Sequence, residues 1–418
     1  MQTLQDLQSG KLIGVKSLKI SENLTSFPKE IFDLADTLEL LDLSNNQLFT
    51  LPDLSLFKRL KIAFFSNNNF VELPASFKEC QNLYMLGFKA NKIEKFDEDI
   101  LPLGISWLIL TDNKIAKLPN SIGNLSKLQK CALAGNKIES LPSSMQNCTN
   151  LELLRLSANN LHDIPSWLLE LPKLSWLAFS GNPCSISPSV TLQTTLHDNL
   201  EFGDLLGSGA SGEIYKAFSK ELEKEVAVKL FRGAVTSDGY AKDEMNACMM
   251  AGEHPNLIKV LAKIEEEKHL GLLLEIISED FYNLGNPPNF ETCSRDTYDE
   301  NIEFTLERIL SISQAIISAS KHLHDNNLMH GDLYAHNILV NDTHNCYLGD
   351  FGAASFYEKE DDRYEKIEVR AFGCLLDDML SRCINNDNKL YVKLNSVKEI
   401  CMQKDVLHRP LFKEIELI

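Results

Sequence analysis

The stretch HGDLYAHNILV, residues 330–340, places an aspartate five residues before an asparagine. This spacing is typical of phosphoryl-transfer sites, where a carboxylate takes the proton of the accepting hydroxyl and an amide oxygen holds a metal ion. We therefore predict that Asp332 is a catalytic residue and that Asn337 is a metal ligand. Both need a strand and a loop to position them, and the apolar run after Asn337 predicts that strand.

Upstream, LLGSGASGEIYKA (residues 205–217) carries glycines in the spacing G-x-G-x-x-G. Glycines let a backbone approach phosphates closely and donate its N–H groups to them. The flanking EIYKA and EVAVKL segments favour strands, whereas a dinucleotide-binding turn would lead into a helix. The sequence thus predicts a phosphate-binding hairpin, and its predicted cofactor contacts are Gly207, Ser208, Gly209, Ala210, Ser211, Gly212 and Ile214.

Three charged residues complete this pattern. VAVK places Lys229 seventeen residues after the last glycine, which fits two strands joined by the charged turn SKELEKE. A helix-like run, YAKDEMNACMMAGEHPNLI, contains Glu244, the expected ion-pair partner of Lys229, with Asp243 as the neighbouring alternative. YLGDFGAAS supplies Asp350 as a second predicted ligand for magnesium.

These five motifs, in this order, resemble the eukaryotic-type protein kinase family over roughly residues 198–418. The resemblance implies an α+β bilobal domain that uses ATP and Mg²⁺, with Lys229 and Glu244 in the catalytic apparatus. It also implies further nucleotide contacts from Ala227, Lys229, Glu275, Ile277 and Leu339.

The resemblance continues beyond the chemistry. IEVRAFGCLL (residues 367–376) is similar to the helix that anchors the larger lobe, with Glu368 where the family has Asp and Arg370 where it has Trp. HRP (residues 408–410) resembles the family's late arginine motif, which implies a structural role for Arg409.

Several departures from the family bear on regulation and substrate. Gly331 replaces the arginine that normally binds a phosphate on the activation loop, and no Ala-Pro-Glu motif follows Asp350 before Glu368. We therefore expect activity without loop phosphorylation, with Ser355, Tyr357 and Tyr364 dispensable as acceptors. Tyr334 and His336 match neither the Ser/Thr nor the Tyr kinase signature, and Ser/Thr acceptors are predicted by elimination.

Two other functions remain open. Small-molecule phosphotransferases share the glycine loop, the lysine and an H-x-D loop, but generally lack Asp-Phe-Gly and the R-A-F-G helix, both of which are present here. A nucleotide-binding scaffold without catalysis would be expected to have lost one of the five motif residues, and none is lost.

The first half of the chain repeats itself. The frame L-x-x-L-x-L-x-x-N recurs every 22 or 23 residues and resembles an α/β leucine-rich repeat solenoid, or horseshoe, of about eight repeats. We expect a structural ladder from the closing asparagines, which are Asn23, Asn46, Asn68, Asn91, Asn113, Asn136, Asn159 and Asn182.

Apolar side chains recur at the third and fifth positions of this frame, which face outward on the concave side of a solenoid. Such a stripe favours a protein partner or, alternatively, a flank packed on the second domain. The predicted stripe is Leu40, Ile62, Phe64, Met85, Trp107, Ile109, Leu153 and Trp176.

Composition limits the remaining classes. Residues 1–190 hold 18 Lys and Arg against 19 Asp and Glu, so nearly all of the net charge of −18 falls in residues 191–418 and argues against nucleic acid. No membrane span, signal peptide or paired-cysteine motif is evident, so a cytoplasmic protein is expected. The predicted domains are a repeat domain (1–190), a linker (191–199) and a kinase domain (200–418).

Overall fold

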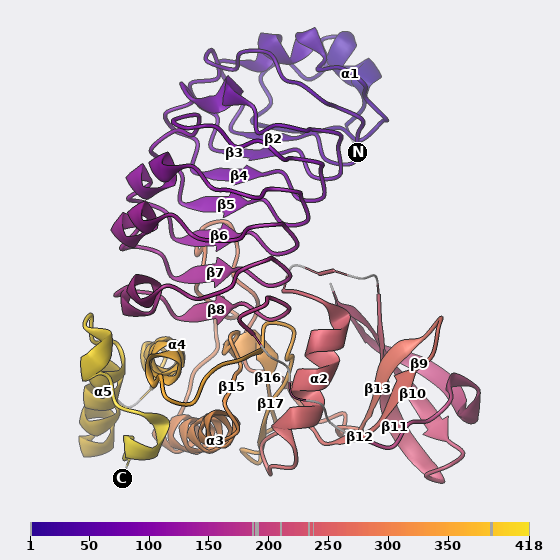
Figure 1. Ribbon diagram of the computed structural model, residues 1–418, viewed down its shortest axis with the longest axis vertical. Coiled ribbons are helices and arrows are strands. Elements are labelled where there is room, and N and C mark those ends of the chain that lie inside the picture. The colour runs from indigo at the N-terminus through magenta and orange to yellow at the C-terminus, as the bar shows by residue number, and fades with distance from the viewer. Residues whose placement is uncertain are drawn as a thin grey trace. The chain divides into compact units, whose positions relative to one another are not determined.

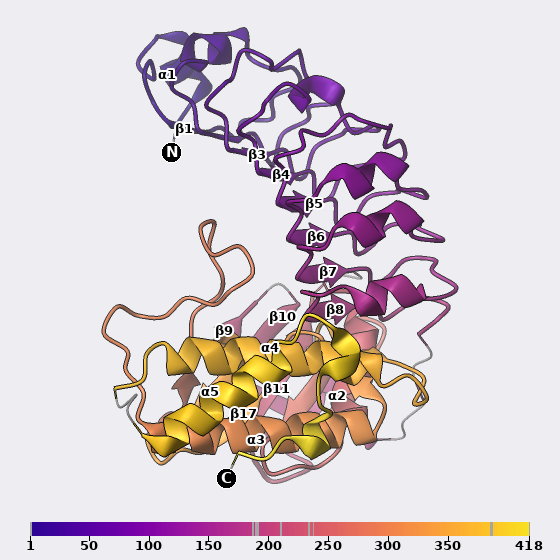
Figure 2. The ribbon, with the colours of Figure 1, turned by 90° about the vertical axis from the view of Figure 1, so that its left-hand side faces the viewer.

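The computed structural model describes residues 2–185, 188, 192–209, 211–232, 235–236, 238–384 and 388–417. By packing, the chain divides into two compact units, Met1–Leu171 and Pro172–Ile418 (Figures 1 and 2). The repeat pattern of the sequence extends past this division. The eighth repeat therefore packs within the second unit.

The first unit is a solenoid of short parallel strands that pair in chain order (Figure 1). Its elements are α1 (Leu4–Gln8), β1 (Ser17–Lys19), β2 (Leu40–Asp42), β3 (Ile62–Phe64), β4 (Met85–Gly87), β5 (Trp107–Ile109), β6 (Lys130–Ala132) and β7 (Leu153–Arg155), with 3₁₀ turns at Lys29–Leu34, Ala75–Phe77, Asn120–Asn124, Ser143–Asn147 and Ser166–Glu170. The central residue of each strand points into the core, as at Leu41, Leu86 and Leu108, which are fully buried. One turn cannot bury these side chains alone, but stacked turns share a continuous core.

The predicted asparagine ladder is confirmed in this unit from Asn46 to Asn159, whereas its predicted first member, Asn23, is exposed. Asn113 Nδ2 donates to the carbonyls of Phe88 (2.9 Å) and Leu110 (3.0 Å), and its Oδ1 accepts from the N–H of Ile93 (3.0 Å). The same pattern recurs at Asn136. Each amide thus satisfies backbone groups of neighbouring turns where the chain bends.

The apolar stripe is more buried than predicted. Ile62, Met85 and Trp107 are only 7%, 1% and 9% exposed, although water was expected on this face. The reason is the register: each of these side chains lies directly beside the next along adjacent strands, and Lys130 covers the Trp107 ring with its ammonium 4.2 Å from the centroid. Leu40, Phe64 and Ile109 keep partial exposure. Leu153 is also buried.

The second unit is bilobal, as predicted. Its elements are β8 (Trp176–Ala178), β9 (Leu200–Ser208), β10 (Gly212–Ser219), β11 (Lys224–Phe231), α2 (Ala241–Ala251), β12 (Val260–Glu265), β13 (Leu270–Leu274), β14 (Tyr282–Asn283), α3 (Leu306–Asp325), β15 (Leu328–Met329), β16 (Ile338–Val340), β17 (Cys346–Leu348), β18 (Ser355–Phe356), α4 (Arg363–Leu380) and α5 (Lys389–Cys401). Short 3₁₀ turns occur at His197–Asn199, Ala335–Asn337, Val406–His408 and Phe412–Glu414.

The smaller lobe is an antiparallel sheet in the order β12-β13-β11-β10-β9, with α2 packed on it. Met245 and Met249 of α2 bury against Leu272 of β13, which fixes the helix on the sheet. The larger lobe is mainly helical. The Thr305 side chain caps the start of α3 by accepting from the N–H of Arg308, and Ile309, Ile312 and Ile316 give that helix its buried face.

Among the described residues, no helix is long and apolar enough to cross a membrane.

Candidate active site

The glycine-rich hairpin joins β9 to β10. Gly212 is required sterically, because a Cβ there would lie 2.1 Å from the Leu230 carbonyl oxygen of the paired strand β11. Gly207 and Gly209, in contrast, have open space where a side chain would be, so they leave room for a ligand at the turn. Gly209 donates its N–H to the Gly212 carbonyl (2.9 Å), which closes the turn. Ala210 lies outside the described residues.

The predicted ion pair forms between β11 and α2. Lys229 Nζ contacts Glu244 Oε1, and Asp350 Oδ1 lies 4.0 Å from the same nitrogen. Burial disfavours the charged ammonium, but the carboxylates of Glu244 and Asp350 outweigh burial and raise the pKa of Lys229. Burial also raises the pKa of Glu244 to about 7, against the lowering effect of Lys229. The neighbouring alternative, Asp243, makes no such pair: its Oδ2 is buried without a hydrogen-bond partner among the described residues.

An apolar cavity opens beside this pair. Its walls combine the polar ends of Lys229, Glu244 and Asp350 with apolar side chains from both lobes, namely Ile214, Cys248, Leu257, Ile258, Val260, Leu272, Leu274 and Phe351. A mostly apolar cleft with a few convergent polar groups is the usual form of a small-molecule site.

Some predicted nucleotide contacts do not line this cavity. Ala227 is buried on β11 beside Leu274, and Leu339 lies on β16. The N–H of Glu275 is engaged by the Lys259 carbonyl (2.9 Å), so its carbonyl is the main-chain group it can offer a ligand. Ile277 follows in the same connecting segment after β13. Ser208 ends β9, and Ser211 lies between the glycines.

Asp332 and Asn337 are brought together by the loop before β16. Asn337 Nδ2 donates to the Asp332 carboxylate and to its carbonyl, each at 2.9 Å. His330 is fully buried, donates or accepts through Nε2 at the Gly349 carbonyl (2.9 Å), and packs its ring near Phe351. This contact ties the Asp332 loop to the segment that carries Asp350.

Glu368 of α4 binds the loop of Asp332 through hydrogen bonds. Its carboxylate accepts from the N–H of Gly331 (2.7 Å), from the N–H of His330 (3.2 Å) and from His324 Nε2 (2.8 Å). The group is fully buried, and burial alone would raise its pKa. The hydrogen bonds and the nearby histidines outweigh burial and lower the pKa of Glu368. Glutamate can therefore orient the loop at the position where the family has aspartate.

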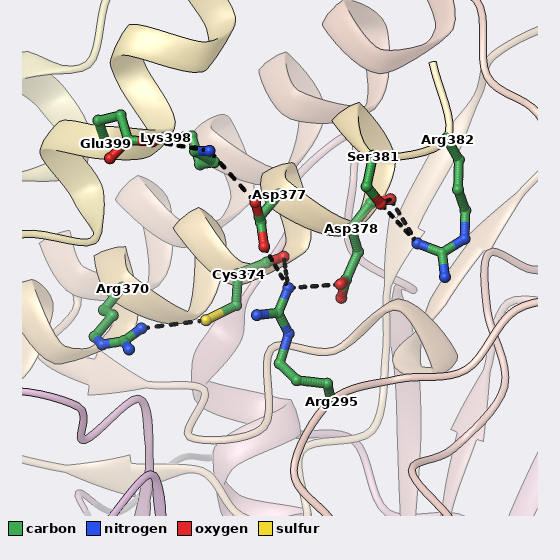
Figure 3. Close-up of polar contacts among 9 residues, drawn as sticks. All are labelled: Arg295, Arg370, Cys374, Asp377, Asp378, Ser381, Arg382, Lys398 and Glu399. Carbon is green, nitrogen blue, oxygen red and sulfur yellow. Dashed lines mark hydrogen bonds and ion pairs between the residues drawn. The ribbon is translucent and has the colours of Figure 1, made fainter. Parts of the chain in front are cut away.

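A second support comes from the segment between β14 and α3. Asp296 accepts from the His336 ring (2.7 Å) and from the His336 N–H (3.2 Å), beside Asn337. The adjacent Arg295 donates to the Cys374 carbonyl (2.8 Å) and pairs with Asp377 and Asp378 (Figure 3). Burial raises the pKa of Asp378 to about 6, with Arg295 opposing that rise.

Further ion pairs and hydrogen bonds surround the same end of α4. Lys398 of α5 bridges Asp377 (3.4 Å) and Glu399 (2.9 Å), while Arg382 bonds Ser381 (3.0 Å), as Figure 3 shows. The segment before α3 is thus fastened to both α4 and, through His336, to the loop of Asp332.

The segment after Asp350 is short, as predicted. β18 pairs with β15, and α4 begins at Arg363. The expectation that Ser355 and Tyr364 are dispensable as phosphate acceptors stays a prediction, but both side chains have packing roles in the second unit. Ser355 is fully buried and accepts from the Phe179 N–H (2.9 Å), while Tyr364 is buried beside the Phe179 ring.

Two groups beside the site were not assigned to it from the sequence. The repeat pattern assigned Trp176 to a partner surface, with packing on the second domain as the alternative. The packing alternative is confirmed, because Trp176 is 1% exposed and stacks on Tyr334. The sequence analysis gave no role to Asp296, because in the sequence it is one aspartate among other polar residues, with no motif around it.

Comparison with known proteins agrees with this geometry. Residues 200–372 match the family model of the protein kinase domain. A probable cyclin-dependent serine/threonine-protein kinase of Dictyostelium discoideum is 29% identical over 177 residues, which cover 40% of this chain and 24% of that protein. Fibroblast growth factor receptor 1 of Xenopus laevis is 28% identical over 170 residues, which cover 38% of this chain and 21% of the receptor.

A solved leucine-rich repeat protein of Leptospira interrogans is similar over 42% of this chain and 51% of its own, with 28% identity and a TM-score of 0.36. The chain spans less than a third of the length of the curated relatives it matches. The family match shows a protein kinase domain at residues 200–372, and the parallel-strand solenoid earlier in the chain agrees with the leucine-rich repeats that the sequence predicted.

Proposed function

We propose that the chain is an ATP-dependent protein kinase that transfers a phosphoryl group to serine or threonine hydroxyls. One observation carries the proposal: Lys229, Glu244 and Asp350 converge at the mouth of an apolar cleft. The loop of Asp332 is hydrogen-bonded to the segment of Asp350 through His330 and Gly349, so the two carboxylates belong to one connected framework. A site that had lost its chemistry would have no need to keep this arrangement.

The residues fit the cofactors that the kinase domain implies. Asp350 and Asn337 offer carboxylate and amide oxygens, the ligand types that Mg²⁺ prefers, and the Asn337 amide uses its nitrogen toward Asp332, which leaves its oxygen for a metal. When bound, ATP supplies the phosphoryl group, and Mg²⁺ neutralises the negative charge of the phosphates.

The chain's own groups then have separate tasks. Lys229, held by Glu244, is a fixed positive charge for phosphate oxygens. The backbone N–H groups of the glycine hairpin would bind the phosphates. Asp332 orients the acceptor hydroxyl and takes its proton, and Asn337 holds that carboxylate in place by its 2.9 Å hydrogen bond.

Serine and threonine are the proposed acceptors. The name of the Dictyostelium relative supports this choice, while the match to a growth factor receptor keeps tyrosine as the outcome to be tested. The repeat domain is proposed to recruit a protein partner through the part of its concave face that keeps exposure at Leu40, Phe64 and Ile109. The ten cysteines are scattered without a C-x-x-C pair, which supports the proposal of a cytoplasmic protein.

The test is transfer from radiolabelled ATP with Mg²⁺ to mixed protein acceptors, followed by phosphoamino-acid analysis. Label on serine or threonine that disappears in Asp332→Asn supports the proposal, and label on tyrosine alone revises the acceptor. Transfer only to small-molecule alcohols would favour a phosphotransferase. Tight ATP binding without transfer to any acceptor would favour a nucleotide-binding scaffold.

A further inference from the structure

The eighth repeat, residues 172–185, belongs to the same compact unit as the kinase domain, and its strand β8 lies against α4 (Figures 1 and 2). The indole of Trp176 donates from Nε1 to the carbonyl of Leu333 (3.0 Å), the residue that directly follows Asp332. Its ring stacks on Tyr334 with centroids 4.3 Å apart and planes at 7°. One side chain of the repeat therefore contacts both residues that follow the proposed catalytic base.

The backbone of the same strand closes on the preceding residue. Gly331 has φ +74°, and a Cβ there would lie 2.6 Å from the carbonyl oxygens of both Leu177 and Ala353. The loop of Asp332 thus passes between the repeat and the segment after Asp350, with no room for a side chain. This close approach explains why glycine replaces the arginine that the kinase family usually has.

The repeat also contacts the segment that follows Asp350. The N–H of Phe179 donates to Ser355 Oγ (2.9 Å), and Ser185 Oγ donates to the Phe356 carbonyl (3.4 Å). The Phe179 ring packs near Tyr364 at the start of α4. These bonds fasten β18, which is the whole of the regular structure between Asp350 and α4.

The two ends of the eighth repeat contact the larger lobe and the helix α2. The Pro172 carbonyl accepts from Arg409 (2.8 Å) and Arg370 (3.3 Å), two buried guanidinium groups of the larger lobe. At the other end, Gly181 has φ +69°, and a Cβ there would lie 2.6 Å from Asp243 Oδ2 and 2.7 Å from the Tyr240 ring. Asp243 is next to Glu244 on α2, so the repeat touches the helix that carries the ion-pair glutamate.

We propose that the eighth repeat is a permanent positioning element for the active site, with Trp176 as the positioning residue for Asp332. The inference rests on the proposed function. Between Asp350 and α4, the regular structure that can brace the catalytic loop is the short strand β18, and Gly331 provides no cation for a phosphate that could order this segment. The repeat takes over this task with contacts to the loop, to β18 and to α2, so the catalytic arrangement needs no modification to form.

The test compares Trp176→Phe with Trp176→Ala and with Trp167→Ala, a matched loss of a tryptophan from the first unit. Phenylalanine keeps the stack on Tyr334 and removes only the N–H donor. Because one hydrogen bond fixes the Leu333 peptide, we expect kcat to fall about 3- to 10-fold in Trp176→Phe with the KM for ATP unchanged. Trp176→Ala should lower kcat further, and Trp167→Ala should leave it unchanged.

Hydrogen exchange provides a readout that does not depend on activity. In Trp176→Phe, peptides covering residues 328–337 should exchange at least 3-fold faster than in the wild type, while those covering 60–110 are unaltered. Wild-type exchange in residues 328–337, or a kcat equal to that of the wild type, would overturn the positioning role. A wild-type protein without transfer would refute the proposed kinase activity, and the exchange result would still decide the role of the repeat.

Discussion

Replacing Gly331 with a residue that has a side chain should damage the protein in a way that can be calculated from its surroundings. At φ +74°, an L-residue costs about 1–2 kcal/mol in backbone strain. The new Cβ would lie 2.6 Å from two backbone carbonyl oxygens, which must move apart, and overpacking of this kind costs about 1–3 kcal/mol. Gly331→Ala should therefore lower the free energy of unfolding of the second unit by about 2–5 kcal/mol, a large share of the ~5–15 kcal/mol of a typical domain.

Gly331→Arg restores the residue usual in the kinase family and should be worse than alanine, because the longer side chain has to leave between Leu177 and Ala353. The control is Gly252→Ala, which has φ +67° but no atom nearer than 3.9 Å to the new Cβ, so it carries the strain without the collision. Its cost should be about 1–3 kcal/mol, with activity retained.

The assay is urea unfolding followed by tryptophan fluorescence in a background that lacks Trp107 and Trp167. Of the three tryptophans, only Trp176 belongs to the second unit, so its emission reports that unit alone. Phosphoryl transfer is measured on the same samples. If Gly331→Arg were as stable and as active as the wild type, the close approach of the eighth repeat to the catalytic loop would be refuted.

The other predictions concern the site itself. Asp332→Asn should abolish transfer while ATP affinity, measured by calorimetry, changes less than 3-fold, and full turnover would remove Asp332 from its role. Lys229→Met and Asp350→Asn should each lower kcat by about 100-fold or more, since both remove charge from the phosphate site; near-normal transfer in either variant would contradict the proposed site. Glu368 has a pKa below its usual 4.5, so its stabilising effect is present above that pH and is lost as pH falls through the lower folded-state value. Glu368→Gln should therefore be less stable than the wild type at pH 7, and its free energy of unfolding should fall less steeply below pH 4.5. If the two proteins lose stability equally below pH 4.5, the charge of Glu368 does not contribute to stability through its contacts with His324 and the loop.

Most members of the candidate site were predictable from sequence because each motif is short and is read locally. The glycine spacing, Lys229, Asp332 and Asp350 were assigned from their immediate neighbours, and Glu244 was preferred over Asp243 by its position in one helical run. The structure brings Lys229, Glu244 and Asp350 together. The hairpin could be assigned for a physical reason as well, since glycine is needed where a backbone must pass close to another strand, as at Gly212.

The repeats show where local pattern reaches its limit. A period of 22 or 23 residues determines the parallel strands, the leucine core and the asparagine ladder, because each repeat meets only its neighbours. The same pattern treats Trp107 and Trp176 as equivalent residues of one face. Their surroundings differ: Trp107 lies beside Met85 and Lys130 of adjacent strands, whereas Trp176 is bonded to the loop of Asp332, more than 150 residues later in the chain.

The sequence by itself determined the two fold classes and the repeat register, and it predicted the candidate residues for phosphoryl transfer, since these depend on spacing within a few turns or strands. Only the tertiary structure decided why Gly331 stands where an arginine is usual, which group orients the loop of Asp332, and that the eighth repeat packs with the kinase domain. Those features come from contacts between segments far apart in the chain, such as Leu177 with Gly331 and Pro172 with Arg409. No periodicity encodes such pairs, because the complementarity of the two surfaces exists only once both have folded.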